Sequence, residues 1–373
     1  MKKKIVQILP AFGWGGAQIF CIQLSNALFR TFGYDVTVVS LYHHNPEKHM
    51  PFSMLDSGIK FVSLGKRSGI DPVMFKKIYK LFKEIQPDIV HSHLHAGYYC
   101  AYAYYKLKHT GMKRFHTFHS MVNVDNPTWY GRAAYRYFSK KDLIHFVSIS
   151  EEVYKSAVKE YGDRIKKSII NNGAPALKAT DKFEEVKEKI SSLKKNADTK
   201  VLINVARICK EKNQMMLQDC MRELQQKNEN AVAIVVGPVA PGEEELYPQL
   251  LQKKPDNVHY LGASTHVGDY CLNADAFVLS SSYEGLPISL LEAFSIGLIP
   301  VCTPAGGIVN VVNDSNGFIS SDTGKESYFE TLEKFLHAPE KQLDNLRETG
   351  KQLFKDKYSI EHCAAEYIKL YNE

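Results

Sequence analysis

Short apolar runs alternate with longer amphipathic stretches along most of the chain. The runs expected to form strands are residues 4–9, 35–41, 88–93, 114–118, 143–148, 201–206, 231–236, 275–279 and 299–302. The stretches between them carry apolar residues at helical spacing. Strands that alternate with helices predict parallel sheets that are covered by helices on both faces.

A polar segment interrupts this rhythm in the middle of the chain. Residues 174–199 are rich in Lys, Glu and Ala, which predicts a linker and a surface helix. We therefore expect an α/β protein of two Rossmann-like domains, residues 1–173 and 174–356, that face each other across a cleft. Residues 357–373 predict a C-terminal helix that packs back on the first domain, because its aromatic side chains need burial.

The composition agrees with two ordinary domains. The chain has 373 residues, of which 44% are hydrophobic and 24% charged, enough for two cores without disulfides or structural metals. Its seven cysteines contain no Cys-x-x-Cys pair, so they predict reduced thiols and a cytoplasmic protein. No apolar run reaches the roughly 18 residues that a membrane-spanning helix needs.

The charge is divided unequally between the two halves. Residues 1–170 hold 25 basic and 12 acidic residues, whereas residues 171–373 hold 22 basic and 29 acidic residues. No nucleic-acid recognition motif accompanies the basic half, so nucleic acid is not an expected partner. Peripheral contact with an anionic membrane at the inner face, an acidic acceptor, and ordinary solvated helix faces all remain open.

Two carboxylates eight residues apart, Glu284 and Glu292, flank a Gly-Leu-Pro turn that opens an apolar helical pattern. Pro287 suits a first helical turn, so the backbone N–H groups that follow it are free to face an anion. The residues expected to bind a sugar nucleotide at this turn are Leu286, Pro287, Ile288, Ser289 and Glu292. The alternative is an amphipathic helix with two ordinary glutamates.

Two cations follow the first strand of the second half. Arg207 and Lys212 lie in the loop expected after residues 201–206. Arginine grips phosphate oxygens bidentately and lysine adds a point charge, so the pair suits a diphosphate. Because a helix N-terminus that can bind an anion is expected in the same domain, we favour the interpretation that Arg207 and Lys212 bind phosphate. The alternative is that both side chains are simply solvated.

A glycine-rich turn follows the first strand of the chain. Gly15 and Gly16 would let the backbone approach a phosphate or sugar closely. The motif is not Gly-x-Gly-x-x-Gly, so a dinucleotide site is poorly supported. A tight strand-to-helix turn without a ligand is the alternative.

Histidines mark the ends of two strands in the first half. His119 is expected to face the cleft, where it can donate to a sugar hydroxyl or to a developing charge. The run His91-Ser92-His93-Leu94-His95 suggests a metal site, but no carboxylate or cysteine nearby completes a ligand set. The chain also lacks Asp-x-Asp, so leaving-group stabilisation without a metal is expected.

Taken together, these segments resemble the retaining GT-B glycosyltransferases of family 4 over essentially the whole chain. The matching elements are the glycine loop with Gly15 and Gly16, His119, Ser148 to Glu151, Asn172-Gly173, Arg207 with Lys212, Glu284 with Glu292, and Thr303 to Gly307. The resemblance implies that Glu284 contacts the donor sugar and Glu292 the ribose hydroxyls. It also implies transfer with retention, the departing phosphate taking the acceptor proton. Gln18, Ala174-Pro175 and Asn310 depart from the family pattern.

These observations predict an enzyme that moves a hexose from a nucleoside diphosphate sugar to a glycan or lipid-linked acceptor in cell-surface polysaccharide synthesis. His119 and Glu284 are the expected catalytic residues, and no cofactor is expected. Two alternatives remain: a nucleotide-sugar epimerase of the GT-B type, and a degenerate transferase that acts as a binding subunit.

Overall fold

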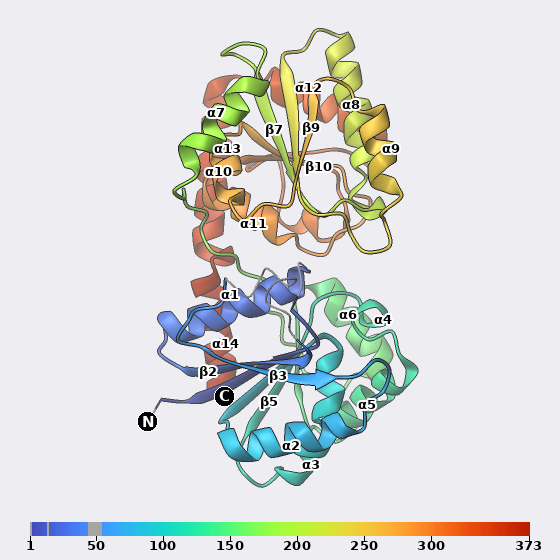
Figure 1. Ribbon diagram of the computed structural model, residues 1–373, viewed down its shortest axis with the longest axis vertical. Helices are drawn as coiled ribbons and strands as arrows, with labels where there is room; N and C mark the ends of the chain where they lie inside the picture. Colours follow the sequence, from blue (N-terminus) through green and yellow to red (C-terminus); the bar gives the residue numbers. More distant parts are fainter. Residues whose placement is uncertain (1, 13–14, 44–53) are drawn as a thin grey trace. The chain divides into compact units, whose positions relative to one another are not determined.

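The computed structural model of the protein describes residues 2–12, 15–43 and 54–373. The chain divides into two compact units (Figure 1). Unit 1 contains residues 1–174 and 360–373, and unit 2 contains residues 175–359. Each unit is built around a parallel sheet of six strands, which confirms the expected α/β fold with two Rossmann-like domains.

The sheet of unit 1 has the strand order β3-β2-β1-β4-β5-β6. Its strands are β1 (Lys4–Leu9), β2 (Asp35–Tyr42), β3 (Lys60–Lys66), β4 (Ile89–His93), β5 (Lys113–Phe118) and β6 (His145–Ser148). Its helices are α1 (Gly16–Arg30), α2 (Val73–Ile85), η2 (Leu94–Cys100), α3 (Ala101–Lys106), α4 (Val122–Asp125), α5 (Trp129–Lys140), α6 (Glu151–Tyr161) and α14 (Ile360–Asn372). The order reverses beside β1, so the strand ends around β1 and β4 are where a ligand is expected.

The sheet of unit 2 has the order β12-β11-β10-β7-β8-β9. Its strands are β7 (Lys200–Val205), β8 (Ala231–Val236), β9 (Val258–Gly262), β10 (Ala276–Leu279), β11 (Ile299–Cys302) and β12 (Phe318–Ile319). Its helices are α7 (Phe183–Leu193), η3 (Lys210–Lys212), α8 (Gln214–Gln226), α9 (Leu246–Lys253), α10 (Val267–Leu272), α11 (Ile288–Ser295), η4 (Gly306–Asn310), α12 (Lys325–Leu336), α13 (Glu340–Leu353) and the π-helix η5 (Phe354–Tyr358).

Three strands escaped the sequence prediction, and all three lie at sheet edges. β3, β9 and β12 are the outermost strands of their sheets. Most of their residues are half-buried or exposed, unlike those of the continuously buried β8. An edge strand is covered on fewer sides than a central one, so it needs no continuous apolar run.

Helix packing follows the amphipathic pattern. In α2, Met74, Ile78 and Phe82 are buried at a spacing of four residues, while lysines occupy the outer face. These side chains join the core on one face of the unit 1 sheet. In unit 2, α8 and α12 bury residues such as Leu217 and Leu332 in a separate core.

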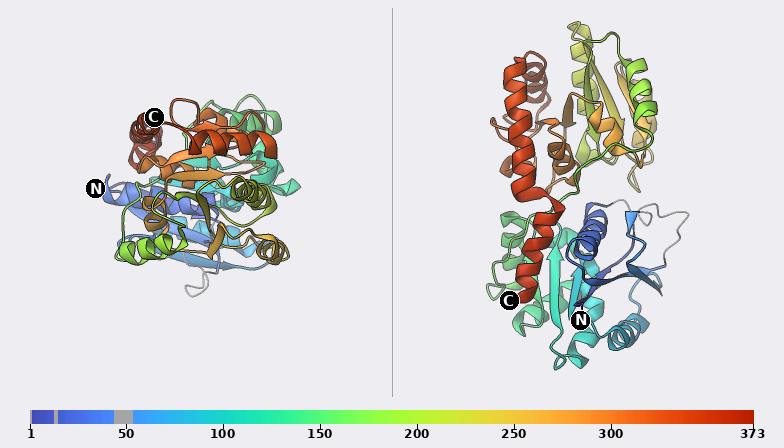
Figure 2. Two further views of the ribbon diagram at one scale, coloured as in Figure 1. Left: turned by 90° about the horizontal axis from the view of Figure 1, so that it is seen from above. Right: turned by 90° about the vertical axis from the view of Figure 1, so that its left-hand side faces the viewer.

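The last helix, α14, belongs to unit 1, where it contacts α1 and the sheet (Figures 1 and 2). The hydroxyl of Tyr367 lies 2.9 Å from Thr117 Oγ1, and the hydroxyl of Tyr371 lies 2.7 Å from His91 Nδ1. Lys113 Nζ also donates to the carbonyl of Tyr371 at 2.8 Å. The aromatic side chains of this helix are therefore buried through polar contacts as well as apolar ones.

No helix within residues 2–12, 15–43 and 54–373 has the length and apolar character needed to cross a membrane.

Candidate functional site

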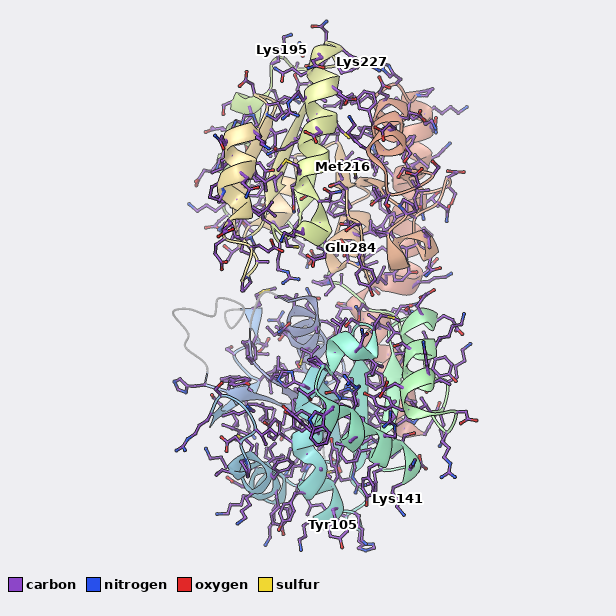
Figure 3. The ribbon with its side chains drawn as sticks, turned by 90° about the vertical axis from the view of Figure 1, so that its right-hand side faces the viewer. Tyr105, Lys141, Lys195, Met216, Lys227 and Glu284 are labelled. Atoms are coloured by element: carbon purple, nitrogen blue, oxygen red, sulfur yellow. The ribbon has the colours of Figure 1, made fainter. Side chains whose placement is uncertain are left out.

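The cations and carboxylates of the second half gather at the carboxyl edge of the unit 2 sheet. Arg207 follows β7 and Glu284 follows β10, two strands that pair in parallel. Loops after neighbouring parallel strands emerge at the same edge. Figure 3 shows Glu284 at the end of the unit opposite Lys195 and Lys227.

The loop that carries Glu284 is tied to the turn that carries Lys212. Ser280 Oγ lies 3.0 Å from the carbonyl oxygens of both Lys212 and Asn213, to which it can donate. The backbone N–H of Ser282 donates to the carbonyl of Glu211 at 2.8 Å. Asn213 has φ +50°, which turns the chain from η3 into α8. These hydrogen bonds hold the Glu284 loop and the Lys212 turn together.

Lys212 and Glu284 form an ion pair. Lys212 Nζ donates to both carboxylate oxygens of Glu284, at 2.5 Å to Oε2. Ser281 Oγ donates to Oε1 at 2.7 Å. Glu284 is only 7% exposed, so its charge is balanced mainly by this lysine. The sequence prediction assigned the lysine to a diphosphate and the glutamate to a sugar, and it did not foresee that the two bind each other or that Ser281 joins them.

The loop of residues 303–307 packs directly against the backbone at Glu284. Gly307 N–H donates to the Glu284 carbonyl at 3.2 Å, and a Cβ on Gly306 would lie 1.9 Å from that same oxygen. Gly306 also has φ +52°, and a Cβ on Gly307 would lie 2.1 Å from the Gly285 carbonyl. Only glycine allows this approach, so these two residues shape the backbone around the carboxylate.

The helix after Glu284 starts one residue later than expected. Pro287 is the N-cap of α11, with extended ψ of 125°, and is not part of the first turn. Leu290 makes the first backbone hydrogen bond, to the Pro287 carbonyl at 3.1 Å. The N–H groups of Ile288 and Ser289 precede it, so they keep the orientation that suits an anion. The difference arises because a proline φ fits the N-cap as well as the first turn.

The remaining two predicted residues of this segment, Leu286 and Glu292, differ in burial. Leu286 is buried, and Glu292 is half-buried on the first turns of α11. The Glu292 carboxylate adds to the effect of burial in raising the pKa of the Cys271 thiol. Glu292 therefore lies near Cys271 of α10.

Arg207 is the exposed cation of the group. Its carbonyl accepts from Gln214 Nε2 at 2.9 Å, which fixes its backbone to the start of α8. The loop after β8 runs against it, because a Cβ on Gly237 would lie 1.9 Å from the Ala206 carbonyl. Its guanidinium has no carboxylate within ion-pair distance among the residues that the structure describes.

The glycine turn of unit 1 opens α1. Gly15 is the N-cap, and its carbonyl accepts the N–H groups of Gln18 and Ile19, both at 3.1 Å. Gly16 is the first helical residue, and a Cβ there would meet nothing within 4 Å. Gly13 and Trp14 of the same motif lie outside the described residues.

His119 follows β5, and its ring is held by other side chains of unit 1. His119 Nε2 lies 2.9 Å from His93 Nδ1, and its backbone N–H donates to Asp125. Burial lowers the pKa of His119 to about 3 and raises the pKa of Asp125 to about 7. The imidazole is therefore neutral near pH 7, and a role as a charged donor is not supported.

The other strand histidines are also engaged by protein groups. His91 lies 2.7 Å from both Tyr371 Oη and Thr117 Oγ1, and His93 lies 2.8 Å from Gln7 Oε1. No group of three or more His, Cys, Asp or Glu side chains in the described ranges could hold a metal ion. The buried histidines hydrogen-bond across the sheet.

Comparison with known proteins gives two family matches. The model of the Glycosyltransferase Family 4 matches residues 14–176, and that of the Glycosyl transferases group 1 matches residues 185–353. The two matches together extend over most of both units.

Two bacterial relatives illustrate the sequence similarity. The chain is 26% identical over 286 residues to the Escherichia coli UDP-Gal:alpha-D-GlcNAc-diphosphoundecaprenol alpha-1,3-galactosyltransferase, with 68% of each chain covered. It is 27% identical over 155 residues to the putative teichuronic acid biosynthesis glycosyltransferase TuaC of Bacillus subtilis, covering 41% of this chain and 38% of TuaC. The match thus spans about two thirds of the first relative and less than half of the second.

Solved structures share the fold at low identity. A glycosyltransferase from Rickettsia africae superposes with a TM-score of 0.80 at 17% identity, covering 100% of this chain and 98% of the other. Anabaena Alr3699/HepE in complex with UDP and glucose superposes with a TM-score of 0.79 at 14% identity, covering 99% of each chain.

Proposed function

This chain belongs to the GT-B glycosyltransferases of family 4, and we propose that it moves a hexose from a nucleoside diphosphate sugar to a lipid-linked glycan, with retention of the anomeric configuration and without a metal ion. The observation that carries the proposal is the set of groups at one edge of unit 2: exposed Arg207, the pair of Lys212 and Glu284, and the start of α11. The E. coli relative, which uses a UDP-sugar and a diphosphoundecaprenol acceptor, makes these the first substrates to test.

In this proposal unit 2 holds the donor through its diphosphate. The Arg207 guanidinium grips the phosphate oxygens bidentately, and the N–H groups of Ile288 and Ser289 face the same anion. Glu292 accepts hydrogen bonds from the ribose hydroxyls.

Lys212 and Glu284 would act on the bond that breaks. As the bond between the anomeric carbon and the phosphate oxygen breaks, negative charge grows on the diphosphate, and Lys212 neutralises it without a metal ion. Glu284 orients that lysine and accepts a hydrogen bond from a donor sugar hydroxyl. The acceptor oxygen bonds the anomeric carbon on the same face, and its proton passes to the departing phosphate.

Arg207 provides the direct test of donor binding. Arg207→Ala should lower kcat/KM for donor hydrolysis without acceptor by about a hundredfold, because a preorganised charge contact is lost. Arg207→Lys should recover part of the activity, since lysine keeps the charge but not the bidentate geometry. Hydrolysis of a panel of UDP- and GDP-sugars, followed by release of the nucleoside diphosphate, measures both effects.

A matched control lies three residues away. The side chain of Lys210 is 81% exposed on the same turn, so Lys210→Ala should leave hydrolysis unchanged. Wild-type rates in Arg207→Ala would contradict the donor site. Epimerised donor sugar that accumulates without acceptor would instead favour the nucleotide-sugar epimerase.

A second proposal concerns contact between unit 1 and an anionic membrane at the cytoplasmic face. Trp129 is 76% exposed and Tyr137 is 50% exposed on one side of α5, which ends with exposed Lys140. Figure 3 shows Tyr105 and Lys141 at one end of unit 1. Exposed aromatic rings beside lysines suit the interface of an anionic bilayer.

The membrane proposal predicts a dependence on lipid charge. Wild-type protein should sediment with vesicles that contain phosphatidylserine and much less with phosphatidylcholine alone, and added salt should release it. Each lysine near an anionic surface contributes about 1 kcal/mol, so Lys140→Glu with Lys141→Glu should weaken binding by at least about tenfold. Lys227→Glu in unit 2 is the control, and equal binding to both kinds of vesicle would exclude the contact.

A further inference from the structure

A row of polar side chains crosses the buried face of the unit 1 sheet. Gln7 on β1, His93 on β4 and His119 after β5 all point to the face that α1 and α14 cover. Gln7 and His93 are 0% exposed. Polar groups this deep in a sheet need hydrogen-bond partners, and here they find one another.

The three side chains form a continuous chain of hydrogen bonds. Gln7 Oε1 lies 2.8 Å from His93 Nε2, and His93 Nδ1 lies 2.9 Å from His119 Nε2. The Phe20 ring of α1 contacts the His119 ring at 5.5 Å between centroids. The backbone N–H of His119 is held separately by Asp125. Both the position and the orientation of the His119 ring are therefore fixed from within unit 1.

The chemistry of these atoms assigns the protons. An amide oxygen can only accept, so His93 Nε2 carries the hydrogen that points to Gln7. Burial lowers the pKa values of His93 and His119 well below the ordinary range, so both rings are neutral. A neutral His93 must then accept at Nδ1, and the hydrogen in the second bond belongs to His119 Nε2. The Nδ1 atom of His119 is left with a lone pair.

The Gln7 amide presents its oxygen to His93 Nε2 at 2.8 Å, and its nitrogen is buried without a hydrogen-bond partner among the described residues. The contact between Oε1 and Nε2 therefore assigns the hydrogen of this bond to His93.

The lone pair on His119 Nδ1 has no hydrogen-bond partner within the described part of the chain, and the atom is buried. Leaving a buried acceptor unpaired is unfavourable, because the group has lost its hydrogen bond to water. An unsatisfied buried group in a native protein calls for an explanation, and a role in binding is one. A hydroxyl group on a substrate is a donor of the kind that this nitrogen lacks.

We propose that Gln7 and His93 are positioning residues that hold His119 as the Nε2–H tautomer, so that Nδ1 accepts a hydrogen bond from a substrate hydroxyl during transfer. The proposal rests on the glycosyltransferase function proposed above. We call the hydrogen bonds from Gln7 to His93 and from His93 to His119 the relay. Without it, His119 would be free to carry its hydrogen on Nδ1, and it would offer the substrate hydroxyl a donor in place of an acceptor. The other tautomer would thus orient the hydroxyl differently.

The test compares substitutions that remove or keep an acceptor for His119. His93→Leu removes it, and should lower kcat by about tenfold or more, as the loss of an orienting hydrogen bond to a functional histidine does. His93→Gln keeps a side-chain oxygen that can accept from Nε2–H, so it should restore most of kcat. His116→Leu is the matched control, because His116 is equally buried on β5 but bonds to Ser92 at 3.0 Å.

A spectroscopic measurement separates positioning from simple loss of packing. In protein with ¹⁵N-labelled histidine, the His119 signals should show Nε2 protonated in the wild type and a mixture of tautomers in His93→Leu. Thermal unfolding checks that each variant folds. If His93→Leu does not fold, Gln7→Leu supplies the same comparison one bond further away.

The outcomes are distinct. Unchanged kcat in folded His93→Leu and Gln7→Leu, or a wild-type His119 protonated at Nδ1, would overturn the relay. A wild type that transfers no sugar would defeat the proposed function, while the NMR signals would still test the tautomer. Loss of kcat in His116→Leu equal to that in His93→Leu would show a general packing effect and would also overturn it.

Discussion

Glu284→Ala is expected to lower sugar transfer to about one hundredth of the wild-type rate or less, because a preorganised charged contact in the site is removed. The loss has two sources. The donor sugar loses a hydrogen-bond acceptor, and Lys212 loses the carboxylate that holds its ammonium group in place. The measurement is transfer from a UDP-sugar to a lipid diphosphate acceptor at saturating donor.

Glu284→Gln separates these two sources. The amide can still accept one hydrogen bond but cannot balance the charge of Lys212, so the variant should stay well below the wild type. Glu326→Ala, at an exposed position in the first turn of α12, is the control for removal of a carboxylate from unit 2. Transfer at the wild-type rate by Glu284→Ala would rule out a role for this carboxylate.

Lys212→Ala is expected to destabilise unit 2 as well as to abolish transfer. The Glu284 side chain is 6% exposed, and without the lysine Ser281 is the only side chain of the described residues left to bond its carboxylate. Removing one partner of a buried ion pair costs about 3–5 kcal/mol, and the partial exposure of Lys212 places this pair near the lower value. The double substitution of Lys212→Met with Glu284→Gln should recover part of the stability, because no unpaired charge remains.

The positions of the two tryptophans allow a loss of stability in unit 2 to be distinguished from one in unit 1. Trp14 and Trp129 both belong to unit 1, so tryptophan fluorescence follows that unit, whereas far-UV circular dichroism follows both. In urea, Lys212→Ala should shift the circular dichroism transition and leave the fluorescence transition in place. The wild type, Lys212→Met, Glu284→Gln and the double variant complete the double-mutant cycle. Strictly additive losses from the two single substitutions would show that the pair contributes nothing.

The fold was largely predictable from the pattern of apolar residues. Central strands such as β1 and β8 are buried on both faces, and an apolar run is the direct consequence of that burial. β3 was missed because most residues of this edge strand are exposed or half-buried. β12 was missed because it has only two residues. The alternation of strands and helices needs no knowledge of long-range contacts.

The candidate site was predictable as a set of residues but not as a set of contacts. Arg207 and Glu284 follow strands that the sequence identified, so their common edge could be expected. The bond between Lys212 and Glu284 could not, because 72 residues separate them and its length depends on how two loops pack. Gly306 could not be explained from the sequence either. A Cβ at this position would collide with the Glu284 carbonyl oxygen, and no local sequence pattern encodes the position of that backbone atom.

The sequence by itself therefore determined the two-domain α/β architecture, the edge of each sheet where chemistry is expected, and the residues with suitable side chains. These follow from periodicity and from the properties of single residues, which are local. Only the tertiary structure decided that Lys212 is held by Glu284, and that His119 ends a relay from Gln7 and His93. Hydrogen bonds act over about 3 Å, and such distances between remote residues are set by strand pairing and loop packing.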